Sequence, residues 1–247
     1  MNDIICMFAK ERIKQYFMSK THKQQQGKKK TTVVSINPDA ARKLKTMLGI
    51  IIAVFAFILY AQSITFDYAY DDGASIKDNS VVTKGIEAIP TILKTDYWYG
   101  LTKDLRVPLY RPASLVLFSL EWQFFPNNPH IGHLINVLLF TFTCWVLFLL
   151  LCKLFKNLNL LFPFICALLY TAHPIHTEAI DNIKSSDELL CFLFALLSIN
   201  LFIKTIEKPS LLNLILASLC YFFSLFSKET GIVFLIIIPL TSLFLQK

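Results

Sequence analysis

The sequence predicts an all-α polytopic membrane protein: a helix bundle of about six transmembrane helices, with an extracytoplasmic loop that carries short interfacial helices. Composition is the first reason, because 55% of the 247 residues are hydrophobic and only 17% are charged, whereas a soluble domain has about 25% charged residues. The second reason is that the charges are segregated along the chain. The third is a series of apolar runs, which we take in order below.

The first element is a basic tail. Residues 1–46 contain eleven Lys and Arg against three acidic residues, a net charge of +8, while the remaining 201 residues have a net charge of −1. Basic charge beside an apolar segment is the usual signal that retains a segment in the cytoplasm, so we expect a flexible cytoplasmic tail. The Lys- and Gln-rich tract 20–30 could instead contact RNA or DNA, but its place near an apolar run favours the membrane interpretation, with no nucleic acid as a partner.

Six apolar runs follow, and with their connections they make up a transmembrane module over residues 47–247. In chain order the runs are Met47–Phe66, Ile131–Cys152, Leu158–Ala172, Leu189–Ile203, Leu211–Phe226 and Gly231–Leu245. A bilayer core needs about 20 helical residues, whereas each of the last four runs has only 15 or 16. Their helices are therefore expected to extend into the polar motifs at their outer ends. Extension of the third run to Ile180, for example, gives 23 residues.

The lysines predict which ends of these runs face the cytoplasm. With the tail inside, successive crossings leave these lysines on the cytoplasmic side: Lys153, Lys156, Lys204, Lys208 and Lys247. This distribution satisfies the positive-inside rule. The sequence thus predicts a multi-pass protein of the inner (plasma) membrane with a cytoplasmic N-terminus.

The opposite, extracytoplasmic face then receives residues 67–130, 172–188 and 227–231. In the first of these segments, a short amphipathic helix is expected over Val81–Leu93. The apolar segment Ala113–Phe125 has only 13 residues, which is too short for a span. We expect it to form a helix that lies in the outer membrane interface.

Ionisable side chains gather in these outer segments. Those that could do chemistry are Asp71, Asp72, Arg106, Arg111, His130, His133, His173, His176, Glu178, Asp181, Lys184, Asp187, Glu188, Lys228 and Glu229. Neighbouring aspartates suit general-base chemistry, because burial or a nearby charge raises the basicity of a carboxylate; the alternative is a solvated turn before Gly73. The arginine fork suits a phosphate, although Arg106 and Arg111 could each be an interfacial anchor.

Residues 173–178, His-Pro-Ile-His-Thr-Glu, end a membrane segment with two imidazoles and a carboxylate. Three interpretations are open: a zinc site, a helix cap, or a site for an anionic headgroup or a leaving phosphate. Pro174 and the absence of an HExxH pattern argue against zinc, whereas Lys184 and Lys228 on the same side favour an anion. Residues 227–231, Ser-Lys-Glu-Thr-Gly, are either a turn with an internal ion pair or a further cationic contact.

Six motifs, taken in order, resemble a known family. They are Tyr70-Asp71-Asp72, Tyr110-Arg111-Pro112, the segment Asn128 to Asn136, the segment His173 to Ala179, the segment Asn182 to Glu188, and the segment Ser227 to Gly231. Over residues 44–247 this set resembles the multi-pass GT-C glycosyltransferases, and within them the transmembrane and tetratricopeptide-repeat O-mannosyltransferase-like group and its bacterial relatives. The sequence has no Walker-type or GxGxxG glycine pattern for a nucleotide.

The resemblance implies a GT-C-like N-terminal module that transfers a sugar from a polyprenyl- or dolichyl-phosphate donor to a hydroxyl of a protein or glycan, at the extracytoplasmic face and with inversion. Asp71 or Asp72 would be the catalytic base. The donor phosphate would contact Arg106, Arg111, His173, His176 and Lys228. Supporting polar residues would be His133, Glu178, Lys184, Asp187, Glu188 and Glu229. The implied partners are the lipid-linked phosphosugar, the acceptor and membrane lipid; no metal ligands are assigned, and a divalent cation stays open as a cofactor.

The sequence departs from the family pattern in two ways. Ser186 stands where relatives often have Arg. Family members also continue with further spans and helical repeats, so the resemblance implies that these residues are an N-terminal piece. Two alternatives from other classes stay open: a transporter or metal-handling membrane protein that uses the pairs His130/His133 and His173/His176, and a non-catalytic membrane fragment.

Overall fold

In a computed structural model of the chain, the structure describes residues 38–102 and 109–245, and every regular element within these two ranges is helical. The elements are α2 (Pro38–Tyr60), η1 (Ala61–Thr65), η2 (Gly73–Lys77), η3 (Val82–Ala88), α3 (Ile89–Ile92), α4 (Pro112–Phe124), α5 (Pro129–Leu154), α6 (Leu161–Thr171), α7 (His176–Ile180), η4 (Ile183–Ser185), α8 (Ser186–Glu207), α9 (Leu211–Ser227), η5 (Glu229–Val233) and α10 (Phe234–Leu245). Residues 42–247 make up one compact unit, which contains all six motifs. The predicted tail lies outside the described residues as far as residue 37.

Three helices are long and apolar enough to cross a membrane. They are Asp39–Thr65 with 27 residues, Pro129–Leu154 with 26, and Ile183–Glu207 with 25. These correspond to the first, second and fourth predicted spans. The other three apolar runs form shorter helices, Leu161–Thr171, Leu211–Ser227 and Glu229–Leu245, so the count of six spans stays a prediction.

The third run does not continue to Ile180 as one helix, so that expectation was wrong. α6 ends at Thr171, and α7 begins separately at His176. Pro174 explains the break, because proline lacks an N–H and disfavours a helical conformation in the residue before it. The ring of His173 stabilises the turn, since its Nδ1 accepts a hydrogen bond of 3.2 Å from the Ile175 N–H. In contrast, α8 does take in the polar residues 186–188 at its start.

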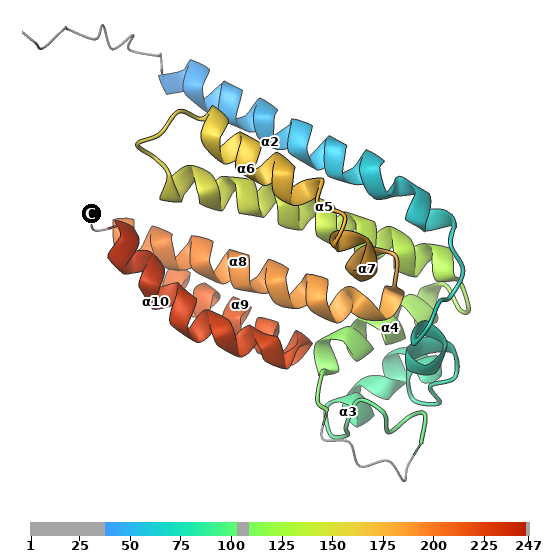
Figure 1. The fold of residues 1–247 in the computed structure, drawn as a ribbon. Helices are drawn as coiled ribbons and strands as arrows, with labels where there is room; N and C mark the ends of the chain where they lie inside the picture. The colour runs from blue at the N-terminus through green and yellow to red at the C-terminus, as the bar shows by residue number, and fades with distance from the viewer. Residues whose placement is uncertain (1–37, 103–108, 246–247) are drawn as a thin grey trace, which may run out of the picture. The chain divides into compact units, whose positions relative to one another are not determined.

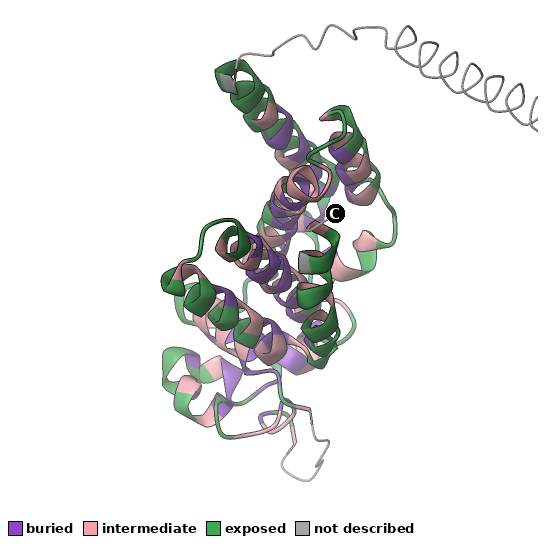
Figure 2. Ribbon diagram, turned by 90° about the vertical axis from the view of Figure 1, so that its left-hand side faces the viewer, coloured by how far each residue is buried: buried purple, intermediate pink, exposed green. Residues whose placement is uncertain are grey.

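α8 is the central helix of the bundle. It packs along α9 and α5, and α10 lies on it (Figure 1). α2 meets α5 through side chains: the Tyr60 ring lies 5.1 Å from the Phe140 ring, and a methyl group on Gly49 would reach Trp145. Buried residues lie where the helices face one another, and exposed residues lie on their outer sides (Figure 2). Small residues at the contacts suit membrane helices, which associate through close packing.

Residues 61–102 and 109–128 form a small helical cap at one end of the bundle. The segment predicted to form one amphipathic helix, 81–93, instead forms two short helices, η3 and α3, with a bend at Gly85, which has a φ of +66°. Its amphipathic character stays a prediction. α4 has the 13 residues expected of the short apolar segment. It packs on η3 and α9, and it buries Phe118 among apolar residues of the cap. Its place in the membrane interface stays a prediction.

The connections that carry the polar motifs lie at this same end of the bundle. The segment after α2, the turn between α6 and α8, and the turn after α9 come together there (Figure 1). The connections after α5 and α8 lie at the other end, where Lys153 donates a 2.8 Å hydrogen bond to the Asn200 side chain. Segments far apart in sequence are therefore in position to build one site.

Candidate functional site

The polar motifs meet at an open cleft of about 740 Å³. Its charged lining residues are Asp71, Glu178, Asp181, Lys184, Asp187, Glu188 and Lys228. Its uncharged lining residues are Tyr70, Thr177, Asn182 and Ser185. Five carboxylates thus face two lysines, so the cleft is richer in hydrogen-bond acceptors and potential bases than the cationic phosphate site that the sequence predicted.

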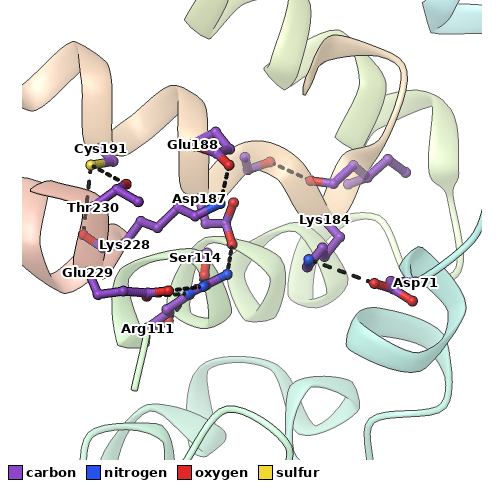
Figure 3. Close-up of polar contacts among 12 residues, drawn as sticks. Asp71, Arg111, Ser114, Lys184, Asp187, Glu188, Cys191, Lys228, Glu229 and Thr230 are labelled. Atoms are coloured by element: carbon purple, nitrogen blue, oxygen red, sulfur yellow. Dashed lines mark hydrogen bonds and ion pairs between the residues drawn. The ribbon is translucent and has the colours of Figure 1, made fainter. Parts of the chain in front are cut away.

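The two aspartates have opposite surroundings. Asp72 is fully buried: its carboxylate accepts hydrogen bonds from the backbone N–H groups of Lys184 at 2.7 Å and Ala69 at 3.0 Å. Burial raises the pKa of Asp72, although these N–H donors oppose the shift. The side chain of Asp71 is 60% exposed, and its Oδ2 lies 3.7 Å from Lys184 Nζ (Figure 3). The structure thus presents Asp71 to the cleft and uses Asp72 to join two loops.

The turn Ala69–Asp72, which contains both aspartates, is strained. Tyr70 has a φ of +46°, in the left-handed region that costs a residue other than glycine about 1–2 kcal/mol. The Asp72 N–H closes the turn on the Ala69 carbonyl at 2.9 Å. The Tyr70 side chain gains no packing in return, because it is 96% exposed. Backbone strain of this kind concentrates at functional sites.

Arg111 lies buried behind the cleft. Its Nη1 donates to Asp187 at 2.7 Å, and its Nε and Nη2 donate to the two oxygens of Glu229, with the Nε bond at 2.9 Å (Figure 3). Burial opposes the positive charge, but the two carboxylates outweigh it and raise the pKa of Arg111. The arginine thereby connects α4, α8 and η5, and its hydrogen-bonding fork is already occupied by carboxylates.

The lysines of the cleft are also paired. Lys228 donates to Glu188 (Figure 3), and Lys184 faces Asp71. These pairs differ from the pair of Arg111 with Asp187, whose side chains are only 8% and 1% exposed, because Glu188 and Asp71 have side-chain exposures of 48% and 60%. Glu229, the other partner of Arg111, is also 60% exposed. An anionic ligand could therefore replace Glu188 or Asp71 at a small cost.

None of the four described histidines lines the cleft. His133 is buried on α5 and shares a hydrogen bond of 3.2 Å with the Asp67 carbonyl; His130 makes a similar bond of 3.0 Å with the Ile64 carbonyl. His173 is exposed and is used in its own turn. His176 lines a smaller pocket beside the cleft. Arg106, the remaining predicted phosphate contact, lies outside the described residues.

The segment Asn128–Asn136 holds the site together, a role that sequence reasoning missed. The Asn136 side chain donates to the Asn182 carbonyl at 2.9 Å and accepts from Ser186. A methyl group on Gly132 would lie 2.6 Å from Ile183, so glycine is required where this loop approaches α5. The signal was present in the sequence, because a polar and glycine-containing start is unusual for an apolar span.

Within the part of the chain that the structure describes, no group of three or more His, Cys, Asp or Glu residues could hold a metal ion. The pairs His130/His133 and His173/His176 use ring nitrogens for different backbone contacts. The metal-handling alternative therefore gains no ligand group from this part of the chain.

A helical protein with three helices long and apolar enough to cross a membrane, and a carboxylate-rich cleft at one end of its bundle, fits a broad class, that of membrane proteins with a polar site. Comparison with known proteins narrows this class of protein. The chain is 28% identical over 191 residues to a protein O-mannosyl-transferase of Caenorhabditis elegans, covering 74% of this chain and 26% of that protein. It is 33% identical over 142 residues to protein O-mannosyl-transferase TMTC1 of Homo sapiens, covering 56% of this chain and 16% of that protein.

A third relative, protein O-mannosyl-transferase Tmtc1 of Drosophila melanogaster, is 29% identical over 189 residues, which cover 75% of this chain and 21% of the relative. The chain thus spans about a quarter or less of the length of these relatives. No family model and no solved structure matches the chain. The relatives support the resemblance to the transmembrane and tetratricopeptide-repeat O-mannosyltransferase-like group, and with it a glycosyltransferase-like function.

Proposed function

We propose that this chain carries the catalytic cleft of a GT-C-type O-mannosyltransferase of the inner (plasma) membrane. It moves a mannosyl group from a polyprenyl- or dolichyl-phosphate donor to a hydroxyl of a protein or glycan at the extracytoplasmic face. The observation that carries this proposal is the exposed carboxylate of Asp71, which opens onto the cleft beside Lys184, while its neighbour Asp72 is buried and fully used.

Asp71 acts as the general base in a single displacement. Its carboxylate takes the proton of the acceptor hydroxyl as that oxygen bonds to the anomeric carbon of the sugar. The bond from the anomeric carbon to the phosphate oxygen breaks at the same time, and its electron pair leaves with the lipid phosphate. The configuration at carbon is inverted. Asp72, hydrogen-bonded to Lys184 N–H and Ala69 N–H, positions Asp71 and does not touch the acceptor.

The leaving phosphate is stabilised by Lys228 and Lys184. Both amines line the cleft, and each can exchange an exposed carboxylate partner for phosphate oxygens. Arg111 has the role of a positioning residue, because it fixes the start of α8 and the turn that bears Lys228.

An apolar groove is a second observation in favour of a lipid-linked donor. It has a volume of about 420 Å³ and is lined by Ile89, Leu93, Pro112, Ala113, Val116, Leu117, Leu120, Leu190, Phe194, Phe223 and Phe226. Phe226 is two residues from Lys228, and Leu190 is two residues from Glu188. An isoprenoid chain in this groove would thus keep its phosphate near Lys228.

The paired variants Asp71→Asn and Asp72→Asn test the assignment. In proteoliposomes with dolichyl phosphate mannose and a serine-rich peptide, Asp71→Asn should lower the transfer rate by about 100-fold to 10,000-fold, with an unchanged melting temperature, because its side chain is exposed. Asp72→Asn should lower the melting temperature, since it places an amide among backbone donors.

Full transfer by Asp71→Asn would overturn the role of the base. Absence of transfer by the unmodified chain, reconstituted and folded, would overturn the proposed function itself. A normal rate and melting temperature in Asp72→Asn would remove its positioning role.

A further inference from the structure

A second, smaller pocket lies beside the cleft and is not used by the mechanism above. It has a volume of about 280 Å³ and lies between α5, α6, α7 and α8. It shares Glu178, Ser185 and Glu188 with the cleft, so the two spaces adjoin. Ligand pockets for drug-sized molecules are about 300–1,000 Å³, and this pocket is therefore suited to something smaller, such as one sugar ring.

Two kinds of side chain form its walls. Phe140, Tyr170 and Phe192 provide aromatic surface, with the Tyr170 and Phe192 rings 6.0 Å apart. Glu178 and Glu188 provide carboxylate oxygens at the opening. This combination matches a pyranose, whose C–H face is apolar and whose edge carries hydroxyl donors. A phosphate would not suit the pocket, because the lining offers carboxylates and no lysine or arginine.

His176 lines this pocket together with the hydroxyl residues Thr143 and Ser185. Its ring lies 4.4 Å from the Tyr170 ring and 5.1 Å from the Phe140 ring, measured between centroids. Burial lowers the pKa of His176, and a hydrogen bond to the Tyr170 backbone opposes this. The lowered pKa favours the neutral form of the ring. Nε2 is buried and has no hydrogen-bond partner among the described residues.

We assign the ring proton of His176 to Nδ1. Nε2 has no partner, so the hydrogen bond that opposes the pKa shift is one from Nδ1, and a backbone carbonyl can only accept it. Nε2 of the neutral ring is then an acceptor. A buried acceptor without a partner costs free energy that a ligand hydroxyl would recover. This differs from the cationic phosphate contact that the resemblance implied for His176.

We infer that this pocket holds the hexose ring of the lipid-linked donor, with a ring hydroxyl donating to His176 Nε2 and other hydroxyls to Glu178 and Glu188. The inference rests on the proposed function, and it makes His176 a specificity-determining residue. The neutral imidazole discriminates through a hydrogen bond, since a sugar that lacks the matching hydroxyl leaves Nε2 unpaired.

The test combines a variant with donor analogues. His176→Phe keeps an aromatic ring against Phe140 and Tyr170 and removes the acceptor. With polyprenyl phosphate mannose it should lower kcat/KM by about 10-fold to 100-fold. Among the four monodeoxy analogues of the donor, one should be poor for the unmodified chain, and His176→Phe should cost nothing further with that analogue. His176→Gln, which restores an acceptor, should recover part of the rate.

Two results would overturn the inference while the proposed function stands: transfer that is unaffected by His176→Phe, or an equal loss with all the analogues. If the unmodified chain transfers no sugar, the proposed function fails. In that case, saturation-transfer NMR with methyl α-D-mannopyranoside decides whether the pocket binds a hexose. A signal that His176→Phe removes and His176→Gln restores would support the pocket, and no such difference would overturn it.

Discussion

At the scale of single residues, burial decides what each ionisable group can do. Asp71 and Asp72 are neighbours, but the first is exposed and the second has no exposed surface. Arg111 and Lys228 are both cations beside α8, yet only Lys228 lines the cleft. A difference in burial of this size changes both the charge state of an ionisable side chain and the access of a ligand to it.

Glu121 gives a prediction about pH. It lies on α4, its Oε1 is buried without a hydrogen-bond partner among the described residues, and burial raises its pKa to about 8. The folded protein keeps this proton up to about pH 8, whereas the unfolded chain loses it near pH 4.5. Stability should therefore fall as the pH rises through this window.

Glu121→Gln removes the titration. At pH 9 its melting temperature should exceed that of the unmodified chain by several degrees, since about 1 kcal/mol corresponds to about 2–4 °C in a protein of this size. At pH 4, below the pKa of the unfolded chain, the two should agree closely. Glu87→Gln, at an exposed position of the same cap, should show no pH-dependent difference. Equal melting temperatures for Glu121→Gln and the unmodified chain at pH 9 would contradict the argument.

At the scale of elements, α5 acts as the frame on which the loops of the site are assembled. Its first turns contact the segment after α2 through His130 and His133, and the loop before α8 through Gly132 and Asn136. A helix that spans a membrane is a rigid support, and sites built on such elements are positioned more accurately than sites on loops alone.

Gly132→Ala tests this frame. Its methyl group would lie 2.6 Å from Cγ2 of Ile183, a branched and stiff side chain, so overpacking should cost about 1–3 kcal/mol. The measurement is thermal unfolding in detergent. Gly73→Ala is the control, because its methyl group would meet Asp78 at an ordinary 3.6 Å.

In the double variant with Ile183→Ala, the total loss of stability should be smaller than the sum of the losses in the two single variants. The shorter side chain at 183 relieves the contact with the new methyl group, and that methyl group fills part of the space that Ile183 leaves. Simple additivity would show that the close approach of Gly132 to Ile183 does not limit stability.

At the scale of the whole molecule, the site requires that the aspartate and histidine motifs share one side of the membrane. The hydrogen bonds of Ser63 to Asp181 and of Lys184 to Asp72 join these segments directly. The second and fourth predicted spans also agree with α5 and α8, whose connections alternate between the two ends of the bundle (Figure 1).

A labelling experiment tests the arrangement in a membrane. In a background without native cysteines, Tyr70→Cys and Ile175→Cys, which are 96% and 65% exposed, should react with a membrane-impermeant maleimide from the extracytoplasmic side. Leu158→Cys, which is 51% exposed at the other end, should react from the cytoplasmic side. Labelling of residues 70 and 175 from opposite sides would exclude a single site.

The sequence by itself determined the helical class, the apolar runs and the six motifs, because hydropathy and local turn residues are encoded in short stretches of chain. Pro174 is also a local signal for the break after α6, but the expected extension of the third run to Ile180 did not take this signal into account. Only the tertiary structure decided that Asp71 rather than Asp72 faces the cleft, that carboxylates occupy Arg111, and that His176 enters an aromatic pocket. These outcomes depend on burial and on partners more than a hundred residues away in sequence, such as Lys184 for Asp72, and no local pattern contains that information.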